Sequence, residues 1–541
     1  MIFNSFFNYH ELINFLTKTA EQHPHLFTMK ILAETNEGNK IYCMEVTDKF
    51  SHVPDDYKSG FYIQGNLHAL EFAGSMQCVY FINYITENYE SDPRLRRLLK
   101  ERIFYIVPRV AVDGTEYILN THSALRCKHI EHEDQPIIKK DLNNDGRILT
   151  MRWKSPYGSF RISDSDHRLM IPIDPLEDVD PDSRYMLAVE GLLNVGVKEN
   201  HLESHYFKYG GDNLDFNRNF PVNWKRISGT NTGKYPLSEL ETRAIADFII
   251  DHPDIIQVID FHTGNPAIFY PNLLGKHNKD YADDWNIVET IGKKGEELLG
   301  FKLLSGYSEE TTGSHAAPLP GCFKDWLYED RGIIPYIIEL GLFYNFLGVP
   351  RFSQYSTASE CEEVTGLALL KWHDSHKESD LFFDWQTFTH PQLGEVEIGG
   401  WNWIKYSNPP LDEMDDICRR CTEFILEMAE WRPRIEINDV QIKKIEDSIF
   451  KIRAMVINNG KLNSSVTKMR AEKNPSKTFI SIENDEGIEY ISGNERVQIQ
   501  EMLSDKGFSE TEWVIRTRSK KACIKLLSKT GIYDEKKIDL C

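Results

Sequence analysis

The sequence lacks any long apolar run, so nothing in its 541 residues reads as a membrane span. Positive charge is also scarce, since 62 Lys and Arg face 83 Asp and Glu, for a net charge of −21. This balance argues against a nucleic-acid partner, because phosphate backbones bind to basic surfaces.

Nine cysteines, irregularly spaced, do not indicate a disulfide framework. The N-terminus has no signal-peptide pattern. We therefore predict a cytoplasmic protein.

Apolar segments alternate with helical ones along most of the chain. Residues 41–46, 61–65, 103–107, 255–261 and 333–338 are strand candidates without polar alternation, and helical patterns lie near 71–89, 238–251, 281–299 and 359–376. This order predicts an α/β fold with a mixed, mainly parallel central sheet and helices on both faces. In such sheets, ligands bind beyond the strand ends. Leu12, Phe15, Leu16 and Ala20 predict a first helix that ends before Pro24, and because it begins so early we expect no pro-segment.

The chain divides near residue 434. The first part, residues 1–434, has a core at about 8–376, a polar insertion at about 126–210 and an extension at 377–434. In the second part, residues 435–541, Phe450, Ile452, Ala454 and Val456 alternate with Lys451, Arg453 and Met455, and an Asn-Gly turn follows at 458–460. The negative charge is concentrated before residue 436. We predict an all-β sandwich for this tail.

His68 and Glu71 are three residues apart after the apolar run that ends at Gly65. A His and a Glu at this spacing can both point at one ion, although a chain with 18 His should contain about one such pair by chance. His262 ends the 255–261 strand, and with it the set has two nitrogens, a carboxylate and an open fourth position. That donor set is typical of catalytic zinc. The alternatives are a helix-start histidine beside a surface glutamate, and a core histidine.

Glu339 ends the strand at 333–338. Burying a lone carboxylate after an apolar run costs free energy, so such a group is expected to have a partner or a chemical role. It could take a proton from a zinc-activated water as general base, or pair with a neighbouring cation. Asp260 could orient a metal ligand only indirectly. Asn217 and Arg218 could grip the terminal carboxylate that an exopeptidase must recognise; the alternative is a buried structural Arg.

Four motifs occur in the order seen in zinc carboxypeptidases of the carboxypeptidase A/B type, which the chain resembles over residues 8–376. They are residues 65–71, residues 215–220, Phe261-His262-Thr263 and Ile338-Glu339-Leu340. The resemblance implies a sheet of about eight mixed strands and one Zn²⁺ per chain on His68, Glu71 and His262. It also implies that Asn217 and Arg218 bind the C-terminal carboxylate of a peptide and that Glu339 is the base.

The family also uses an Arg that polarises the scissile carbonyl. Arg152 is our candidate and Arg126 is the rival. The segment Gly321-Cys322-Phe323-Lys324-Asp325-Trp326 resembles the family's side-chain specificity segment, and Lys324 there would favour an acidic C-terminal residue. The negative charge of the first part would oppose such substrates at long range. The family's mobile tyrosine has no clear counterpart at residues 316–321.

Asp141, Asn143 and Asp145 have the oxygen spacing of the first half of a calcium loop. The twelfth position of that loop is Arg152, which excludes an EF-hand. A Ca²⁺ site and a solvated turn rich in Asx residues both fit the spacing, and the turn is the preferred interpretation.

The sequence thus predicts a zinc-dependent hydrolase that releases C-terminal residues from peptides. Two other functions are compatible with the same motifs: an aspartoacylase-like amidohydrolase that acts on small N-acyl amino acids, and a non-catalytic peptide- or glycan-binding module. The oligomeric state and the role of the tail stay open.

Overall fold

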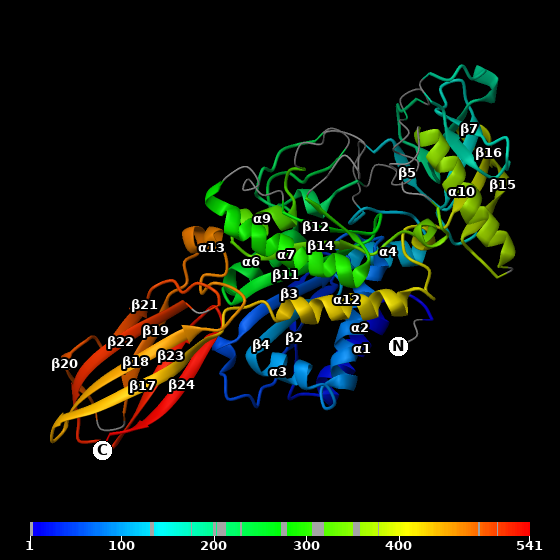
Figure 1. Cartoon of the computed structure of the whole chain (residues 1–541). Coiled ribbons are helices and arrows are strands. Elements are labelled where there is room, and N and C mark those ends of the chain that lie inside the picture. The colour runs from blue at the N-terminus through cyan, green and yellow to red at the C-terminus, as the bar shows by residue number, and fades with distance from the viewer. Residues whose placement is uncertain are drawn as a thin grey trace.

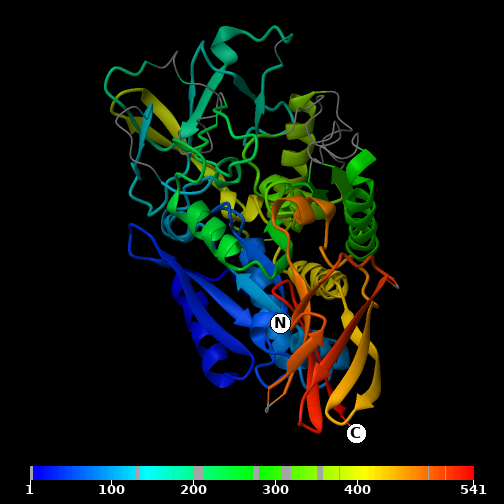
Figure 2. The same ribbon diagram turned by 90° about the vertical axis from the view of Figure 1, so that its left-hand side faces the viewer.

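The computed structural model describes residues 4–129, 135–174, 176–198, 202, 213–227, 230–271, 279–305, 319–349, 357–376, 378–484, 487–505 and 507–540. An α/β unit forms its middle, and a β-sandwich and a second β-sheet lie at opposite ends of that unit (Figure 1). Figure 2 shows the same arrangement from the side, with the sandwich below and the second sheet above. Across the described residues, no helix has the length and apolar character needed to cross a membrane.

The central sheet has eight strands in the order β1-β2-β4-β3-β11-β14-β12-β13. The strands are β1 (Phe27–Glu34), β2 (Lys40–Val46), β4 (Arg102–Val107), β3 (Ser59–Gly65), β11 (Ile255–His262), β14 (Ile334–Glu339), β12 (Ala267–Tyr270) and β13 (Lys302–Ser305). The middle four strands, β4, β3, β11 and β14, run parallel. β1, β2 and β12 run antiparallel to their neighbours on the inner side. The expectation of about eight mixed, mainly parallel strands is confirmed.

Helices cover both faces of this sheet, as predicted. One core cluster joins the sheet to α1 (Tyr9–Gln22), α2 (Phe72–Asn88), α3 (Pro93–Glu101), α7 (Ala282–Leu299) and α12 (Met414–Ala429). The other cluster joins it to α4 (Val112–Thr121), α6 (Leu240–Asp251), α9 (Phe323–Glu329) and α11 (Trp403–Tyr406). Strands buried on both faces have no polar side, which explains their apolar sequences.

The insertion shares one sheet with the first part of the 377–434 extension, whereas α11 and α12 of that extension pack on the central sheet. The shared six-stranded sheet has the order β15-β16-β6-β9-β7-β8. Its strands are β15 (Phe382–His390), β16 (Gly394–Trp401), β6 (Thr150–Lys154), β9 (Tyr185–Val189), β7 (Phe160–Ile162) and β8 (Met170–Pro172). β10 (Gly191–Leu193) pairs with β5 (Ile137–Lys139), and α10 (Ala358–Ser375) packs through Leu370 against β8 and β15. The sequence did not predict this pairing, because the strands are short and come from distant parts of the chain.

The tail is the predicted β-sandwich, built from two four-stranded sheets. One contains β17 (Ile435–Glu446), β18 (Ile449–Asn458), β22 (Gly507–Arg516) and β20 (Glu489–Ser492). The other contains β21 (Arg496–Ile499), β19 (Thr478–Glu483), β23 (Lys521–Ser528) and β24 (Ile532–Asp539). Alternate residues of both sheets, including Ile452, Trp513, Ile480 and Ile524, form one core. We name residues 435–540 the sandwich unit.

A short helix that the sequence did not predict, α13 (Lys468–Lys473), docks the sandwich unit onto the α/β unit. The backbone N–H groups of Lys468 and Met469 donate to the Asp284 carboxylate at 2.7 and 3.0 Å, and the Thr467 hydroxyl donates to the Gly332 carbonyl at 2.7 Å. The Arg470 guanidinium donates to the carbonyl of Ile255, where β11 begins. The sandwich unit therefore sits at the edge of the sheet where β11 and β14 begin.

Candidate active site

Three adjacent parallel strands of the central sheet end at the same edge. β3 ends at Gly65, and β11 and β14 end in register at His262 and Glu339. After β3, Asn66 adopts a left-handed conformation, and its side-chain amide donates to the carbonyls of His68 and Ala69 at 2.7 and 3.1 Å. This turn brings the 68–71 segment over the strand ends before α2 begins at Phe72.

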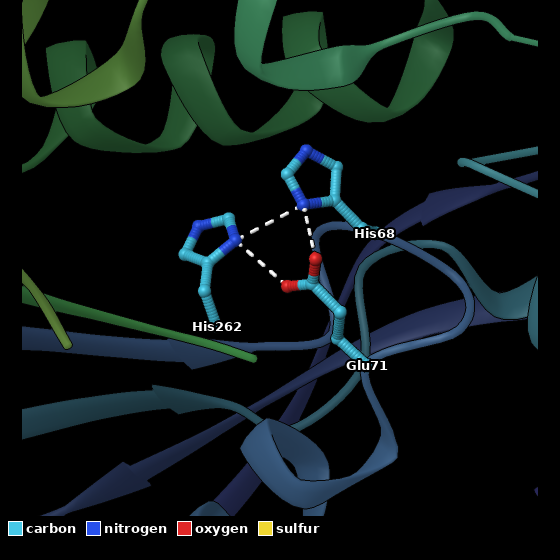
Figure 3. A group of neighbouring side chains, drawn as sticks. All are labelled: His68, Glu71 and His262. Atoms are coloured by element: carbon cyan, nitrogen blue, oxygen red, sulfur yellow. Dashed lines mark hydrogen bonds and ion pairs between the residues drawn. The ribbon is translucent and has the colours of Figure 1, made fainter. Parts of the chain in front are cut away.

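The His68, Glu71 and His262 side chains converge on one point (Figure 3). The Nδ1 atoms of the two imidazoles are 3.0 Å apart. One Glu71 oxygen is 2.9 Å from His68 Nδ1, and the other is 2.8 Å from His262 Nδ1. All three side chains are buried. The structure thus brings together the three residues that the sequence singled out as metal ligands, although His262 is far along the chain from the 68–71 segment.

This donor set fits a zinc ion. Zn–N and Zn–O bonds of about 2.0–2.1 Å in a tetrahedral site place ligand atoms roughly 3.3 Å apart, close to the spacings between these atoms. Burial would raise the pKa of Glu71, but the two imidazoles hold it well below its ordinary value, so the carboxylate is ionised. An anionic carboxylate with two imidazole nitrogens facing each other in a buried site suits a cation.

Each imidazole is oriented by a second carboxylate. His68 Nε2 is 3.0 Å from Asp215 Oδ1, and His262 Nε2 is 2.8 Å from Asp260 Oδ2. These contacts leave both Nδ1 atoms directed at the cluster. The expectation that Asp260 acts only indirectly is wrong, because residues 260 and 262 of a strand share one face. The role of Asp215 was missed, although it stands two residues before the recognised Asn217.

Arg126, not Arg152, lies at the cluster. The Arg126 guanidinium donates to Glu71 Oε1 and to Asp215 Oδ2, each at 3.2 Å. Arg152 lies on β6 of the second sheet, where it pairs with Glu397 at 2.8 Å and stacks 4.4 Å above the Trp385 ring. The choice of Arg152 as the carbonyl-polarising residue is therefore corrected. The insertion forms its own sheet and carries Arg152 away from the ends of β3, β11 and β14.

A small cavity of about 70 Å³ opens beside the cluster. Its walls include residues from four of the recognised motifs: His68, Glu71, Arg126, Asn217, His262, Thr263, Phe269, Cys322, Lys324, Ile337 and Glu339. Lys324 is buried, with its Nζ atom 2.7 Å from Asp325 Oδ1. Arg218 lies behind the wall, where its guanidinium is 3.3 Å from Cys322 Sγ. The side chains predicted to bind substrate therefore gather at one place.

Glu339 faces this cavity from the end of β14. Its Oε2 atom is buried and accepts no hydrogen bond from the described residues. Gly264 leaves the room that this carboxylate occupies, since a Cβ atom at residue 264 would lie 2.7 Å from Oε2. Burial raises the pKa of Glu339 to about 7, and the Glu71 charge adds to the effect. A carboxyl group with such a pKa can both accept and return a proton near neutral pH.

A second group, His68, Cys127 and Asp215, is also compact enough for an ion. Burial raises the pKa of the Cys127 thiol well above its usual value, and this thiol accepts the Phe216 N–H at 3.2 Å. Asp215 is already bound by Arg126 and by His68. These residues therefore support the first cluster instead of forming another metal site.

The Asp141–Asp145 loop is the predicted turn. Asp141 accepts the backbone N–H groups of Asp145 and Gly146 at 3.2 and 2.9 Å, and Asp145 accepts that of Arg147 at 2.8 Å. Among the described residues, no group of donors compact enough for an ion includes this loop. The calcium hypothesis gains no support.

The sequence analysis found no counterpart of the family's mobile tyrosine at residues 316–321. Residues 316–318 of that segment lie outside the described residues.

Comparisons with known proteins agree with this geometry. A family model described as zinc carboxypeptidase matches residues 12–168 and 192–363, and a domain of unknown function matches residues 434–539. Carboxypeptidase B2 of Rattus norvegicus is 22% identical over 381 residues, which are 69% of this chain and 71% of the relative. Mast cell carboxypeptidase A of Homo sapiens is 20% identical over 338 residues, 60% of each chain.

Among solved structures, thrombin activatable fibrinolysis inhibitor aligns with 79% of this chain and 74% of its own, at 15% identity and a TM-score of 0.44. The family model covers more than half of the chain and includes the buried cluster, Arg126 and Glu339. The chain therefore belongs to the zinc carboxypeptidase family and is a metallocarboxypeptidase of the A/B type.

Proposed function

We propose that His68, Glu71 and His262 hold one zinc ion and that the protein uses this site to release the last residue of peptides with a free C-terminal carboxylate. The observation that carries the proposal is the convergence of these three donors beside Glu339, in a cavity that Arg126, Asn217 and Lys324 also line. Two nitrogens, a carboxylate and room for a further ligand are typical of catalytic zinc.

The side chains around the cluster have complementary chemical roles in this proposal. Bound zinc would polarise the scissile carbonyl and lower the pKa of a water molecule to about 7. Glu339 removes the proton from that water and then delivers it to the leaving nitrogen. Arg126 donates N–H groups to the carbonyl oxygen as negative charge develops there. Asp215 and Asp260 keep the two imidazoles in the orientation that binding requires.

Recognition of the chain end is assigned to Asn217 and Arg218. Asn217 lines the cavity, and its Oδ1 atom accepts the Phe323 N–H at 2.9 Å, which leaves its amide N–H groups as donors. Arg218 lies directly behind Cys322 and adds a buried positive charge. Hydrogen bonds from the Asn217 amide, together with the positive charge of Arg218 behind the wall, would bind a terminal carboxylate.

The proposal predicts a strict need for both the metal and the free carboxylate. Zinc-loaded protein should shorten a peptide from its C-terminus. Amidation of that peptide should slow cleavage by about 100-fold, because it removes the charge-assisted hydrogen bonds between the terminal carboxylate and the protein. A chelator should abolish cleavage and added zinc should restore it. Mass spectrometry of the products checks each point. Internal fragments, or equal cleavage of the amidated peptide, would contradict the exopeptidase assignment.

The two other functions are separated by the same assay. An aspartoacylase-like enzyme would hydrolyse N-acetyl-aspartate faster than a blocked dipeptide. A non-catalytic module would bind peptides without turning them over, even when loaded with zinc.

Lys324 supports a preference for an acidic C-terminal residue, because it is a buried cation in the cavity wall. Its partner Asp325 offsets part of the charge. We expect Lys324→Gln, which keeps a hydrogen bond to Asp325, to lower kcat/KM for Glu-ended peptides about 10- to 100-fold relative to Leu-ended ones. Lys324→Arg is the matched control and should keep the preference. An unchanged ratio in Lys324→Gln would remove the basis for acidic specificity.

A further inference from the structure

A second, larger cavity is lined by residues of both the sandwich unit and the α/β unit, around α13. Figure 1 shows α13 where the two units meet. Its volume is about 570 Å³. From the α/β unit it is lined by residues at the start of β11 and β14, such as Ile255 and Ile333. The metal cluster lies at the other ends of the same strands. This cavity is therefore distinct from the peptidase site and needs a separate explanation.

The lining of this cavity is strongly basic. No Asp or Glu occurs among its described lining residues, although the whole chain has a net charge of −21. Six cationic side chains line it: Arg331, Arg470, Lys473, Lys477, Arg496 and Lys529. Such a cluster concentrates positive potential in an otherwise negative molecule, which attracts anions.

Most of these charges have no carboxylate partner among the residues that the structure describes. Within the part of the chain that the structure describes, Lys473, Lys477 and Lys529 make no ion pair, and Arg496 stacks 3.8 Å from the Phe479 ring instead. Arg331 pairs with the exposed Asp330, at 3.8 Å, and with no other carboxylate among the described residues. Like charges held together without counter-charges repel one another. An anion in the cavity would relieve this repulsion.

Arg470 gives the cavity a rigid positive wall. It is buried, and its guanidinium donates to the carbonyls of Ile255, at 2.9 Å, and Pro253. Burial lowers the pKa of Arg470 to about 10, with Asp254 opposing the effect, so the group stays charged at neutral pH. Its position is determined by α13 and by the start of β11, and therefore does not depend on a ligand.

Three hydroxyl groups lie in the same wall. Ser476 Oγ is 2.9 Å from Ser528 Oγ and 3.2 Å from Thr530 Oγ1, and the last two are 3.0 Å apart. A hydroxyl can rotate to donate its hydrogen to a ligand oxygen. The cavity thus combines cations that act as point charges with neutral donors, a combination that suits phosphate oxygens.

We propose that this cavity binds a small molecule carrying two or more phosphate groups. Its volume is in the range of small-molecule sites. Five of its six cations belong to the sandwich unit and Arg331 belongs to the α/β unit, and several cations around one cavity match several negative groups better than one. Since residues 331 and 470 belong to different units, such a ligand would also bridge the α/β unit and the sandwich unit. The proposal does not depend on the peptidase assignment.

Calorimetric titration of the full-length, zinc-loaded protein at physiological ionic strength tests the proposal, with fructose 1,6-bisphosphate as the probe. Saturable binding is expected, about tenfold tighter than that of fructose 6-phosphate, which has one phosphate. The double variant Lys473→Gln/Lys529→Gln should weaken binding of the bisphosphate at least about tenfold. Both side chains are exposed, so the fold should not change.

Lys443→Gln/Lys521→Gln is the matched control, because it removes the same charge from exposed residues of the sandwich unit that do not line the cavity. It should change the affinity by less than about twofold, and both double variants should keep full peptidase activity. No saturable binding, equal weakening by the two double variants, or equal affinity for the two sugar phosphates would overturn the proposal. Tighter binding of a C-terminally amidated tetraglutamate peptide would instead indicate an acidic-peptide site.

Discussion

Glu339→Gln is expected to lower kcat on a blocked dipeptide by about 10²- to 10⁴-fold, the range for loss of a general base. Glutamine has nearly the same shape but cannot accept the proton from water. KM should change little, because Glu339 is not assigned to substrate binding. Steady-state kinetics on zinc-loaded protein measures both parameters.

The zinc content of the variant is the essential control for this experiment. Glu339 is not among the three proposed ligands, so the Glu339→Gln protein should retain one zinc per chain, as measured by elemental analysis. Its melting temperature should not fall, because the substitution removes a buried carboxylate whose Oε2 atom has no hydrogen-bond donor among the described residues. Loss of zinc together with activity, or kcat within about threefold of the parent, would refute the role of general base.

Arg126→Ala and Arg152→Ala are expected to have opposite consequences. Removal of Arg126 should lower kcat by about 10²- to 10³-fold, as for other donors that stabilise an oxyanion. Removal of Arg152 should leave kcat unchanged but destabilise the second sheet by about 1–3 kcal/mol, because it removes a buried guanidinium together with its ion pair to the half-buried Glu397 and its stacking on Trp385. Kinetics and thermal unfolding of both variants provide the comparison.

Arg126 also contacts Glu71 and Asp215, so its loss could weaken zinc binding as well. Arg126→Lys keeps the charge but not the planar fork, and separates these effects. If Arg126→Lys retains zinc and still loses most of kcat, Arg126 acts on the substrate. If Arg152→Ala is the variant that loses activity, the assignment of Arg126 fails.

Several features of this protein follow from short stretches of sequence. Strands buried on both faces must be apolar throughout, and a polar residue at the end of such a run marks the edge where ligands bind. This local rule was enough to place His262 and Glu339 at one edge of the central sheet. The alternation of Phe450, Ile452, Ala454 and Val456 likewise predicted a sandwich. The helix α13 was not predicted, because it is short and because a threonine such as its N-cap Thr467 is also common in turns.

Other features depend on pairings between distant segments, which local patterns do not encode. The sequence analysis favoured Arg152 over Arg126 as the carbonyl-polarising residue, and only the pairing of β6 with β16 shows that Arg152 belongs to another sheet. The basic cavity combines residues from α13, from the sandwich unit and from the starts of β11 and β14, so it exists only after the two units dock. Local sequence patterns therefore indicated the strands of the central sheet and the proposed metal ligands, whereas long-range packing decided which charged side chains meet.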